Sequence, residues 1–127
     1  MTPVFLTLHE VIQVHQDQIE RYGGMPEIRD AGLLQSAVAM PQASFGGQFL
    51  HHNLFEMAAA YLFHIAQNHP FLDGNKRTGA AAAFIFLSMN YVELHPDADD
   101  FEALVLATAC GQAGKDVIAA FLRKYSD

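Results

Sequence analysis

The spacing of apolar residues near the N-terminus predicts an amphipathic helix. Thr7 and Glu10, three residues apart, are typical of a capping box, in which each residue satisfies the other's backbone N–H at a helix start. The helix that follows is expected to extend to about Tyr22. Its apolar face consists of Leu8, Val11, Ile12, His15 and Ile19, which recur at the spacing of helical turns. This face is expected to pack on a core.

The next elements are delimited by a cap and a helix breaker. Asp30 is expected to cap a second helix over residues 31–40, which Pro41 ends because proline cannot continue the helical hydrogen bonds. Residues 42–52 have neither a helical nor a strand period, and two adjacent glycines lie at their centre. A loop or a short hairpin is expected there.

The central helix is expected over residues 54–68. Asn53 and Glu56 mark its start, and apolar residues lie on nearly all of its sides, as in a helix buried within a bundle. A later helix has small residues from Ala80 to Ala83, so neighbouring helices can approach it closely. Two C-terminal helices complete the pattern, from Asp99 to about Ala109 and from Lys115 to Tyr125.

Composition narrows the class of protein. The chain has 127 residues, 51% of them apolar, which predicts one all-α domain over residues 1–127, a compact bundle of about six helices. A net charge of −7 with only seven Lys and Arg argues against direct DNA binding. No apolar run reaches the roughly 18 residues of a membrane span, and the N-terminus has no basic leader. The single cysteine, Cys110, lies in an apolar stretch and is expected to be a buried free thiol, so a soluble cytoplasmic protein is expected.

A polar loop between two apolar helices carries the candidate chemistry. Residues 69–77 read His-Pro-Phe-Leu-Asp-Gly-Asn-Lys-Arg. A helix that begins at Gly74 or Asn75 directs free backbone N–H groups into this loop, and such groups bind anions. Lys76 and Arg77 add positive charge at the helix end where the dipole disfavours it. A bound polyphosphate would remove that conflict.

The remaining ionisable groups of the loop suit the same chemistry. Asp73 offers the single carboxylate typical of Mg²⁺ bound together with nucleotide phosphates. His69 can take a proton from an attacking hydroxyl group. Structural roles are open too: His69 as the cap of the preceding helix, and Asp73 as a turn residue or the ion-pair partner of Arg77. Phe71 is expected to anchor the loop in the core. The combination indicates nucleotide-dependent group transfer.

The loop resembles the signature of the Fic/Doc family, H-P-F-x-[DE]-G-N-[GK]-R. Three other stretches are similar to its death-on-curing branch, which comprises Doc-like toxins: Arg21 to Gly24, Arg29 to Leu34, and Pro41-Gln42. The resemblance implies the Fic/Doc helical fold, with ATP and Mg²⁺ as cofactors. It also implies roles within the loop, with His69 as general base, Asp73 as Mg²⁺ ligand, Asn75, Lys76 and Arg77 as phosphate-binding residues, and Gly74 as the point of close approach.

Two departures from the Fic adenylyltransferase pattern imply which group is transferred. Lys76 stands where those enzymes have a glycine beside the nucleotide phosphates, and Ala80 stands where they have a second arginine. Doc-like toxins share both departures. The resemblance therefore implies that ATP binds in another orientation and gives its γ-phosphate to a Ser or Thr hydroxyl. A kinase acting on a translation factor of the elongation factor Tu type, and thereby arresting translation and growth, is expected.

The resemblance also implies partners. Residues 43–52 occupy the place of the family's flap, which aligns the target peptide by strand addition. His51 and His52 in that segment are expected to be surface residues rather than metal ligands. The inhibitory pattern [ST]-x-x-x-E-[GN] of many Fic enzymes does not occur in the sequence. Inhibition is instead expected from a Phd-like antitoxin that folds a disordered C-terminal segment onto the protein.

Two alternatives stay open at this point. One is a protein adenylyltransferase, because the loop motif is shared with those enzymes. The other is a binding module that keeps the fold without catalysis. The intact His69, Asp73, Asn75 and Arg77 argue against the second alternative.

Overall fold

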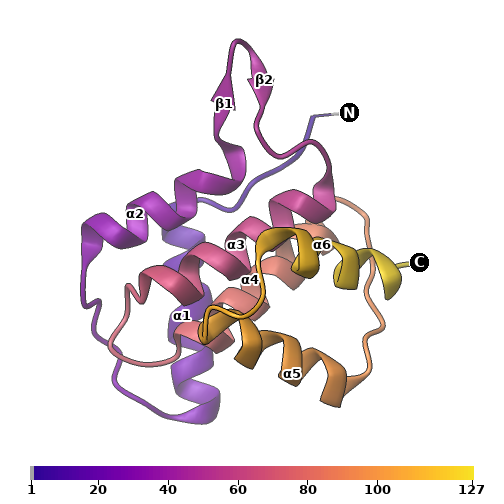
Figure 1. Cartoon of the computed structure of the whole chain (residues 1–127). Helices are drawn as coiled ribbons and strands as arrows, with labels where there is room; N and C mark the ends of the chain where they lie inside the picture. The colour runs from indigo at the N-terminus through magenta and orange to yellow at the C-terminus, as the bar shows by residue number, and fades with distance from the viewer. Residues whose placement is uncertain (1) are drawn as a thin grey trace.

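The computed structural model describes residues 2–127, which form six α-helices, a short 3₁₀ turn and a two-stranded hairpin (Figure 1). The elements are α1 (Leu8–Tyr22), α2 (Ala31–Ala39), η1 (Met40–Gln42), β1 (Ser44–Phe45), β2 (Gln48–Phe49), α3 (Leu54–Asn68), α4 (Asn75–Met89), α5 (Ala98–Ala109) and α6 (Lys115–Lys124). The expected helical bundle with a hairpin is confirmed. None of the helices in residues 2–127 combines the length and apolar character needed to cross a membrane.

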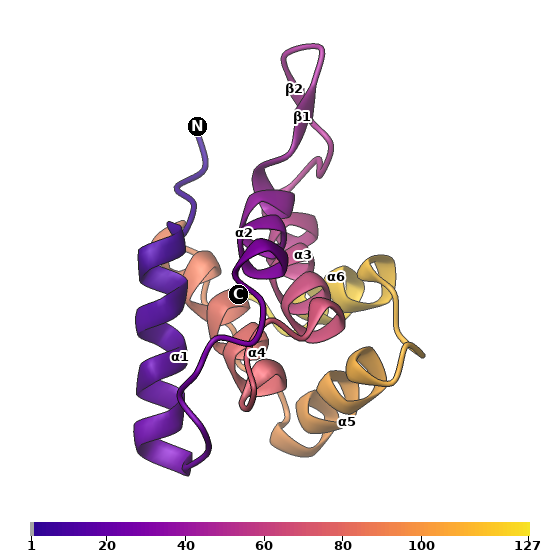
Figure 2. The same cartoon turned by 90° about the vertical axis from the view of Figure 1, so that its left-hand side faces the viewer.

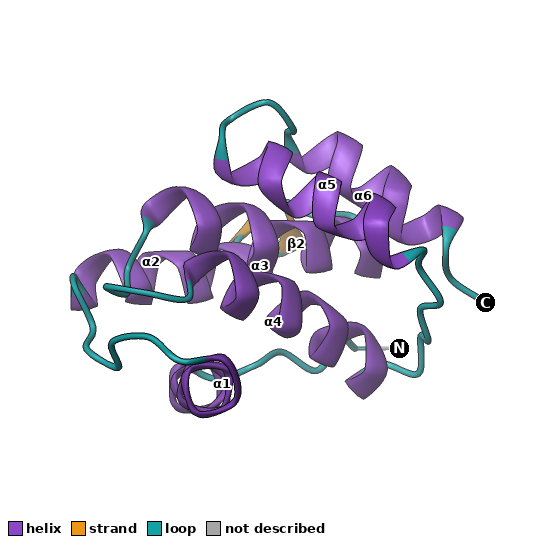
Figure 3. Ribbon diagram, turned by 90° about the horizontal axis from the view of Figure 1, so that it is seen from below, coloured by secondary structure: helices purple, strands orange, loops and turns teal. Residues whose placement is uncertain are grey.

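The helices form three layers. Figures 2 and 3 show α1 on one side, α2, α3 and α4 in the middle, and α5 and α6 on the other side. The middle layer is the core of the molecule: Tyr61, Leu62 and Ile65 of α3 are fully buried, as are Phe86 and Leu87 of α4. The loop between α3 and α4 therefore joins two helices of the buried core.

Local sequence signals account for the helix starts. The Thr7 side chain accepts a hydrogen bond from the Glu10 N–H at 3.1 Å, and the Glu10 carboxylate accepts one from the Thr7 N–H at 2.9 Å. This confirms the capping box of α1. The side chains of Asp30 and Asn53 likewise accept a backbone N–H at the starts of α2 and α3.

Small residues bring α3 and α4 into close contact. A Cβ atom added at Gly79 would lie 3.1 Å from the Leu62 carbonyl oxygen, so a larger residue there would push the backbones of the two helices apart. Tyr61 of α3 also holds the segment before α1, because its hydroxyl accepts a hydrogen bond from the Leu6 N–H at 2.9 Å. Burial raises the pKa of Tyr61 to about 12. The start of α4 is thus fixed against α3.

The segment of uncertain period forms a hairpin. Ser44 pairs with Phe49 and Phe45 with Gln48, and the intervening Gly46 and Gly47 have φ angles of 60° and 80°. Positive φ at both central residues is what a two-residue hairpin turn of type I′ requires. Figure 1 shows the hairpin projecting away from the helices, and the Phe45 side chain is 83% exposed.

Three local predictions were wrong. The cap of α5 is Asp97 rather than Asp99; the Asp97 side chain accepts the Asp100 N–H at 3.0 Å, and α5 begins at Ala98 instead of Asp99. Cys110 is exposed rather than buried, since it follows the last turn of α5 where the chain leaves the core. His51 is buried, because it lies between the hairpin and α6, whereas His52 is exposed as expected.

Candidate functional site

The polar loop connects the C-terminus of α3 to the N-terminus of α4. His69 is the C-cap residue of α3 and has left-handed backbone angles, with φ 52° and ψ 52°. This confirms its capping position, and its side chain is exposed. Gly74 begins α4 with φ 80°, and a Cβ atom there would lie 3.3 Å from both Arg77 Nη2 and Ile19 Cδ1. The positive φ favours glycine at this position, whereas the two neighbouring atoms are the ends of flexible side chains that could shift by a few tenths of an ångström.

Asn75 holds the loop in shape. Its side-chain oxygen accepts a hydrogen bond from the Phe71 N–H, and its side-chain nitrogen donates to the Phe71 carbonyl oxygen, both at 2.9 Å. The Asn75 side chain is almost completely buried. Its amide therefore braces the loop, and the group that Asn75 presents to an anion is its backbone N–H.

His15 supports the loop from α1. Its ring stacks on the fully buried Phe71 ring with centroids 3.7 Å apart and planes 4° apart. Its Nε2 atom donates to the Asp73 carbonyl oxygen at 2.8 Å, which requires the tautomer protonated at Nε2. Burial is the main cause that lowers the pKa of His15. A neutral histidine thus fixes the backbone at Asp73.

The segment after α1 positions the charged residues. The Met25 N–H donates to Asp73 Oδ2 at 2.8 Å, and Arg77 Nη2 donates to the Gly23 carbonyl oxygen at 3.0 Å. The Arg77 guanidinium also lies 5.6 Å from the centre of the Tyr22 ring. Arg77 is not paired with Asp73, since the ion pairs of residues 2–127 join other residues.

Arg29 holds the backbone that carries His69. Its guanidinium donates to the His69 carbonyl oxygen at 2.6 Å and to the Asn68 carbonyl oxygen at 3.0 Å. The Arg29 and Asp30 N–H groups both donate to the Pro70 carbonyl oxygen. Carbonyl groups at a helix end favour a cation, so Arg29 stabilises the C-terminus of α3 and the position of His69 together.

These residues line a cleft of about 410 Å³. Its walls are formed by Ala66, His69, Leu72, Asp73, Gly74, Asn75, Lys76, Arg77 and Ala109. Every residue that the sequence predicted for the site lies on this cleft. The first turn of α4 has free N–H groups, and the exposed Lys76 and the half-buried Arg77 add charge beside them. The cleft can bind a polyanion next to an exposed imidazole and a carboxylate.

Sequence reasoning missed three residues that organise the site. His15 stood on the apolar face of the first helix, and a polar residue at a core position was the one signal that could have shown its role. Arg29 was noted only as part of a stretch that resembles the family. Met25 acts through its backbone, which no side-chain pattern can indicate.

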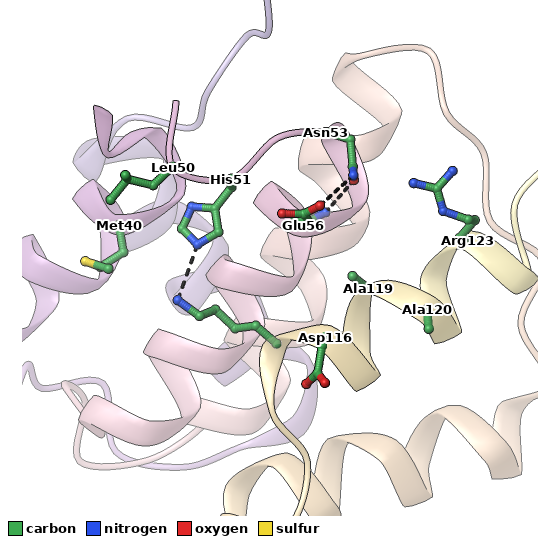
Figure 4. A pocket seen from close by; sticks show the side chains of 10 residues that line it. Met40, Leu50, His51, Asn53, Glu56, Asp116, Ala119, Ala120 and Arg123 are labelled. Atoms are coloured by element: carbon green, nitrogen blue, oxygen red, sulfur yellow. Dashed lines mark hydrogen bonds between the residues drawn. The ribbon is translucent and has the colours of Figure 1, made fainter. Parts of the chain in front are cut away.

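A larger cavity, of about 680 Å³, lies away from the loop between η1, α3 and α6 (Figure 4). The Lys115 ammonium lies 3.3 Å from His51 Nε2 and 3.2 Å from His64 Nε2 at its edge. Burial and the Lys115 charge lower the pKa of both histidines, that of His64 to about 4. The two neutral imidazoles accept hydrogen bonds from Lys115 and thereby join α3 and the segment before it to α6.

We expect acid to weaken this junction. An unfolded histidine binds a proton near pH 6.5, whereas folded His64 binds one only near pH 4, so the free energy of unfolding should fall as pH decreases from 6.5 to 4. Urea unfolding across this range measures the slope. His64→Gln should reduce the slope, and the same change at the exposed His9 should not. Equal slopes in wild type and His64→Gln would contradict the assignment.

Comparisons with known proteins identify a family and relatives of this chain. The model of the Fic/DOC family matches residues 5–87, which include α1 to α4 apart from the last two residues of α4. Toxin Doc from Mycolicibacterium smegmatis is 43% identical over 107 residues, covering 83% of this chain and 82% of the relative. Protein kinase doc from Escherichia phage P1 is 34% identical over 115 residues, covering 91% and 90%. The chain therefore belongs to the Fic/DOC family.

Proposed function

We propose that the protein is a Doc-type toxin that transfers the γ-phosphate of ATP to a Ser or Thr hydroxyl of a target protein. The observation that carries the proposal is the cleft that joins His69, Asp73 and the cationic N-terminus of α4. The two relatives support the type of activity, since one is named a toxin and the other a protein kinase.

Each group of the cleft has a step in this reaction. His69 takes the proton of the target hydroxyl, whose oxygen attacks the γ-phosphorus while the bond to the β,γ-bridging oxygen breaks and ADP leaves. Lys76, Arg77 and the free N–H groups of α4 hold the phosphates and stabilise the charge that moves onto the leaving oxygen. His69 then releases its proton to solvent.

Asp73 suits a magnesium ion. The Met25 N–H fixes one of its carboxylate oxygens, which leaves the other for a cation, and Mg²⁺ commonly uses one protein carboxylate together with phosphate oxygens. When bound, Mg²⁺ supplies positive charge to the phosphates during transfer. Asp73 is oriented for that role by Met25 and by the contact of its carbonyl oxygen with His15.

Labelled ATP tests the proposed function. Incubation with ATP labelled at the γ-phosphate and with a bacterial extract should label a protein, and elongation factor Tu is the target we propose. Label transferred only from the α-phosphate would overturn the kinase in favour of adenylyl transfer. The absence of any transfer by folded protein would favour a binding module.

We propose that Lys76 determines which phosphate of ATP is transferred, the γ-phosphate rather than the α-phosphate. Lys76→Gly should lower γ-phosphate transfer about tenfold or more, because a hydrogen bond to a charged group contributes roughly 1.5–3 kcal/mol. Initial rates with labelled ATP measure the effect. Lys124→Gly, at the exposed end of α6, is the control and should transfer at the wild-type rate. Unchanged transfer by Lys76→Gly would refute the role.

The names of the relatives also support an antitoxin partner. We propose a Phd-like protein whose disordered C-terminal segment folds onto this chain in the cytoplasm. The reading frame beside the gene provides the first test. A short protein with a DNA-binding half and a polar tail is expected there, and co-expression should restore growth.

A further inference from the structure

The cavity of about 680 Å³ between η1, α3 and α6, called here the α3–α6 cavity, takes no part in the proposed reaction. Its volume lies within the range of sites that bind small organic molecules, roughly 300–1,000 Å³. Figure 4 shows His51 at one end of the cavity and Arg123 at the other, with Ala119 and Ala120 between them. The charges at the His51 end indicate what the cavity can bind.

The Lys115 ammonium at that end is a half-buried cation without a negative partner. It donates to the neutral imidazoles of His51 and His64, and the centre of the Phe63 ring lies 5.8 Å away. The ion pairs found in residues 2–127 join other side chains. Lys115 is also the first residue of α6, where the helix dipole disfavours a cation. An anion in the cavity would supply the missing negative charge.

The two carboxylates that line the cavity have other roles. Glu56 Oε2 accepts a hydrogen bond from Asn53 Nδ2 at 2.7 Å, and Glu56 Oε1 accepts one from the His52 N–H at 3.2 Å. Both oxygens therefore serve the start of α3. Asp116 is exposed in the first turn of α6, where the helix dipole favours a negative charge. Neither carboxylate is ion-paired with a cation in the part of the chain that the structure describes, so Lys115 is left for a ligand.

His51 adds a hydrogen-bond donor to the same end of the cavity. Its side chain is only 8% exposed, and its Nε2 atom accepts from Lys115, so the proton of this neutral ring is on Nδ1. The Nδ1 atom is buried and has no hydrogen-bond partner among the described residues. A buried donor without an acceptor is costly. This end of the cavity thus favours a ligand that has negative charge and accepts hydrogen bonds.

The rest of the wall suits an apolar body. Met40 and Leu50 line the cavity beside His51, and Ala119 and Ala120 leave space along α6 because their side chains are small. A ligand site with a mostly apolar wall and few polar groups takes its orientation from those polar groups. Lys115 is expected to fix the head of such a ligand.

We propose that the α3–α6 cavity binds a small organic acid, whose carboxylate or phosphate group pairs with Lys115 and whose apolar body lies over Ala119 and Ala120. The inference does not depend on the proposed function, because the cavity and the cleft of the polar loop share no lining residue.

NMR titration of the full-length protein with three ring compounds tests the inference. Benzoate and phenyl phosphate carry the two possible head groups, and benzamide has a similar shape without charge. The two acids should shift the imidazole signals of His51 and His64, and the acid with the lower Kd identifies the preferred head group. Benzamide should bind about tenfold more weakly or less, because it lacks the charge that Lys115 pairs with. The His69 signal reports binding at the cleft separately.

Two pairs of variants locate the site. Lys115→Gln should raise the Kd of the preferred acid about tenfold or more, whereas Lys124→Gln, which removes an exposed charge outside the cavity, should not. Ala120→Glu should weaken binding by a similar factor, because it places a negative charge on the cavity wall and leaves Lys115 intact. Val117→Glu is its control, since Val117 is 51% exposed on α6 and does not line the cavity.

Three results would each overturn the inference. The first is a folded wild type in which neither acid shifts the His51 and His64 signals. The second is benzamide binding as tightly as the acids, because the cavity would then select apolar surface and not charge. The third is equal weakening by Ala120→Glu and Val117→Glu. If Lys115→Gln did not fold, this last comparison would decide alone.

Discussion

His69→Gln is expected to lower phosphoryl transfer by roughly 10²–10⁴-fold while the protein stays folded, because a positioned general base contributes about that factor. Glutamine keeps the size and polarity of the side chain but cannot take up the proton. The His69 side chain is exposed, and the hydrogen bonds of this residue in the fold are made by its backbone. The change should therefore affect chemistry and not stability.

Initial rates and thermal unfolding measure the two effects separately. His9→Gln is the matched control, because His9 is also exposed and lies on α1 away from the cleft. Its transfer rate should equal that of the wild type. If His69→Gln kept full toxicity in cells with no detectable transfer, the protein would act by binding rather than catalysis.

Phe71→Ala is expected to have the largest effect on stability, roughly 3–5 kcal/mol lost from the free energy of unfolding. The Phe71 ring is completely buried and stacks on His15, so its removal leaves a cavity beneath the loop. A typical domain has only about 5–15 kcal/mol of stability, so the variant should unfold at a much lower urea concentration.

The same substitution should also lower transfer at temperatures where the protein is folded. Phe71 exchanges two hydrogen bonds with Asn75 and pairs with Ile28, so a displaced Phe71 moves the backbone between His69 and Asp73. Phe45→Ala is the control for stability, because the Phe45 side chain is 83% exposed at the hairpin. A loss below about 1 kcal/mol for Phe71→Ala would contradict the anchoring role.

Most of the fold could be predicted because its signals are local. The caps at Thr7, Asp30 and Asn53 are each recognised from a few neighbouring residues, and all three are present. The start of α5 was ambiguous because Asp97 and Asp99 both have a residue three positions on that suits a cap. The choice between them depends on where the preceding connector meets the bundle.

The candidate site could be predicted in part. The loop residues are adjacent in sequence, so their grouping in one cleft follows from the chain itself. Burial at His51 and exposure at Cys110 were mispredicted, because both depend on how α3, α5 and α6 pack and not on neighbouring residues. The contacts that fix the loop join residues 40 to 58 positions apart, which a local pattern cannot indicate.

Those distant contacts have a consequence for the timing of activity. His15, Met25 and Arg29 all precede the loop by 40 residues or more, and each holds its backbone or the Asp73 carboxylate. Contacts of such separation carry a cost in loop-closure entropy, so they are not made by the loop segment on its own. A nascent or partly folded chain would therefore carry the whole motif without a working site. Activity should therefore appear only in chains in which α1 and the segment after it have packed against the loop.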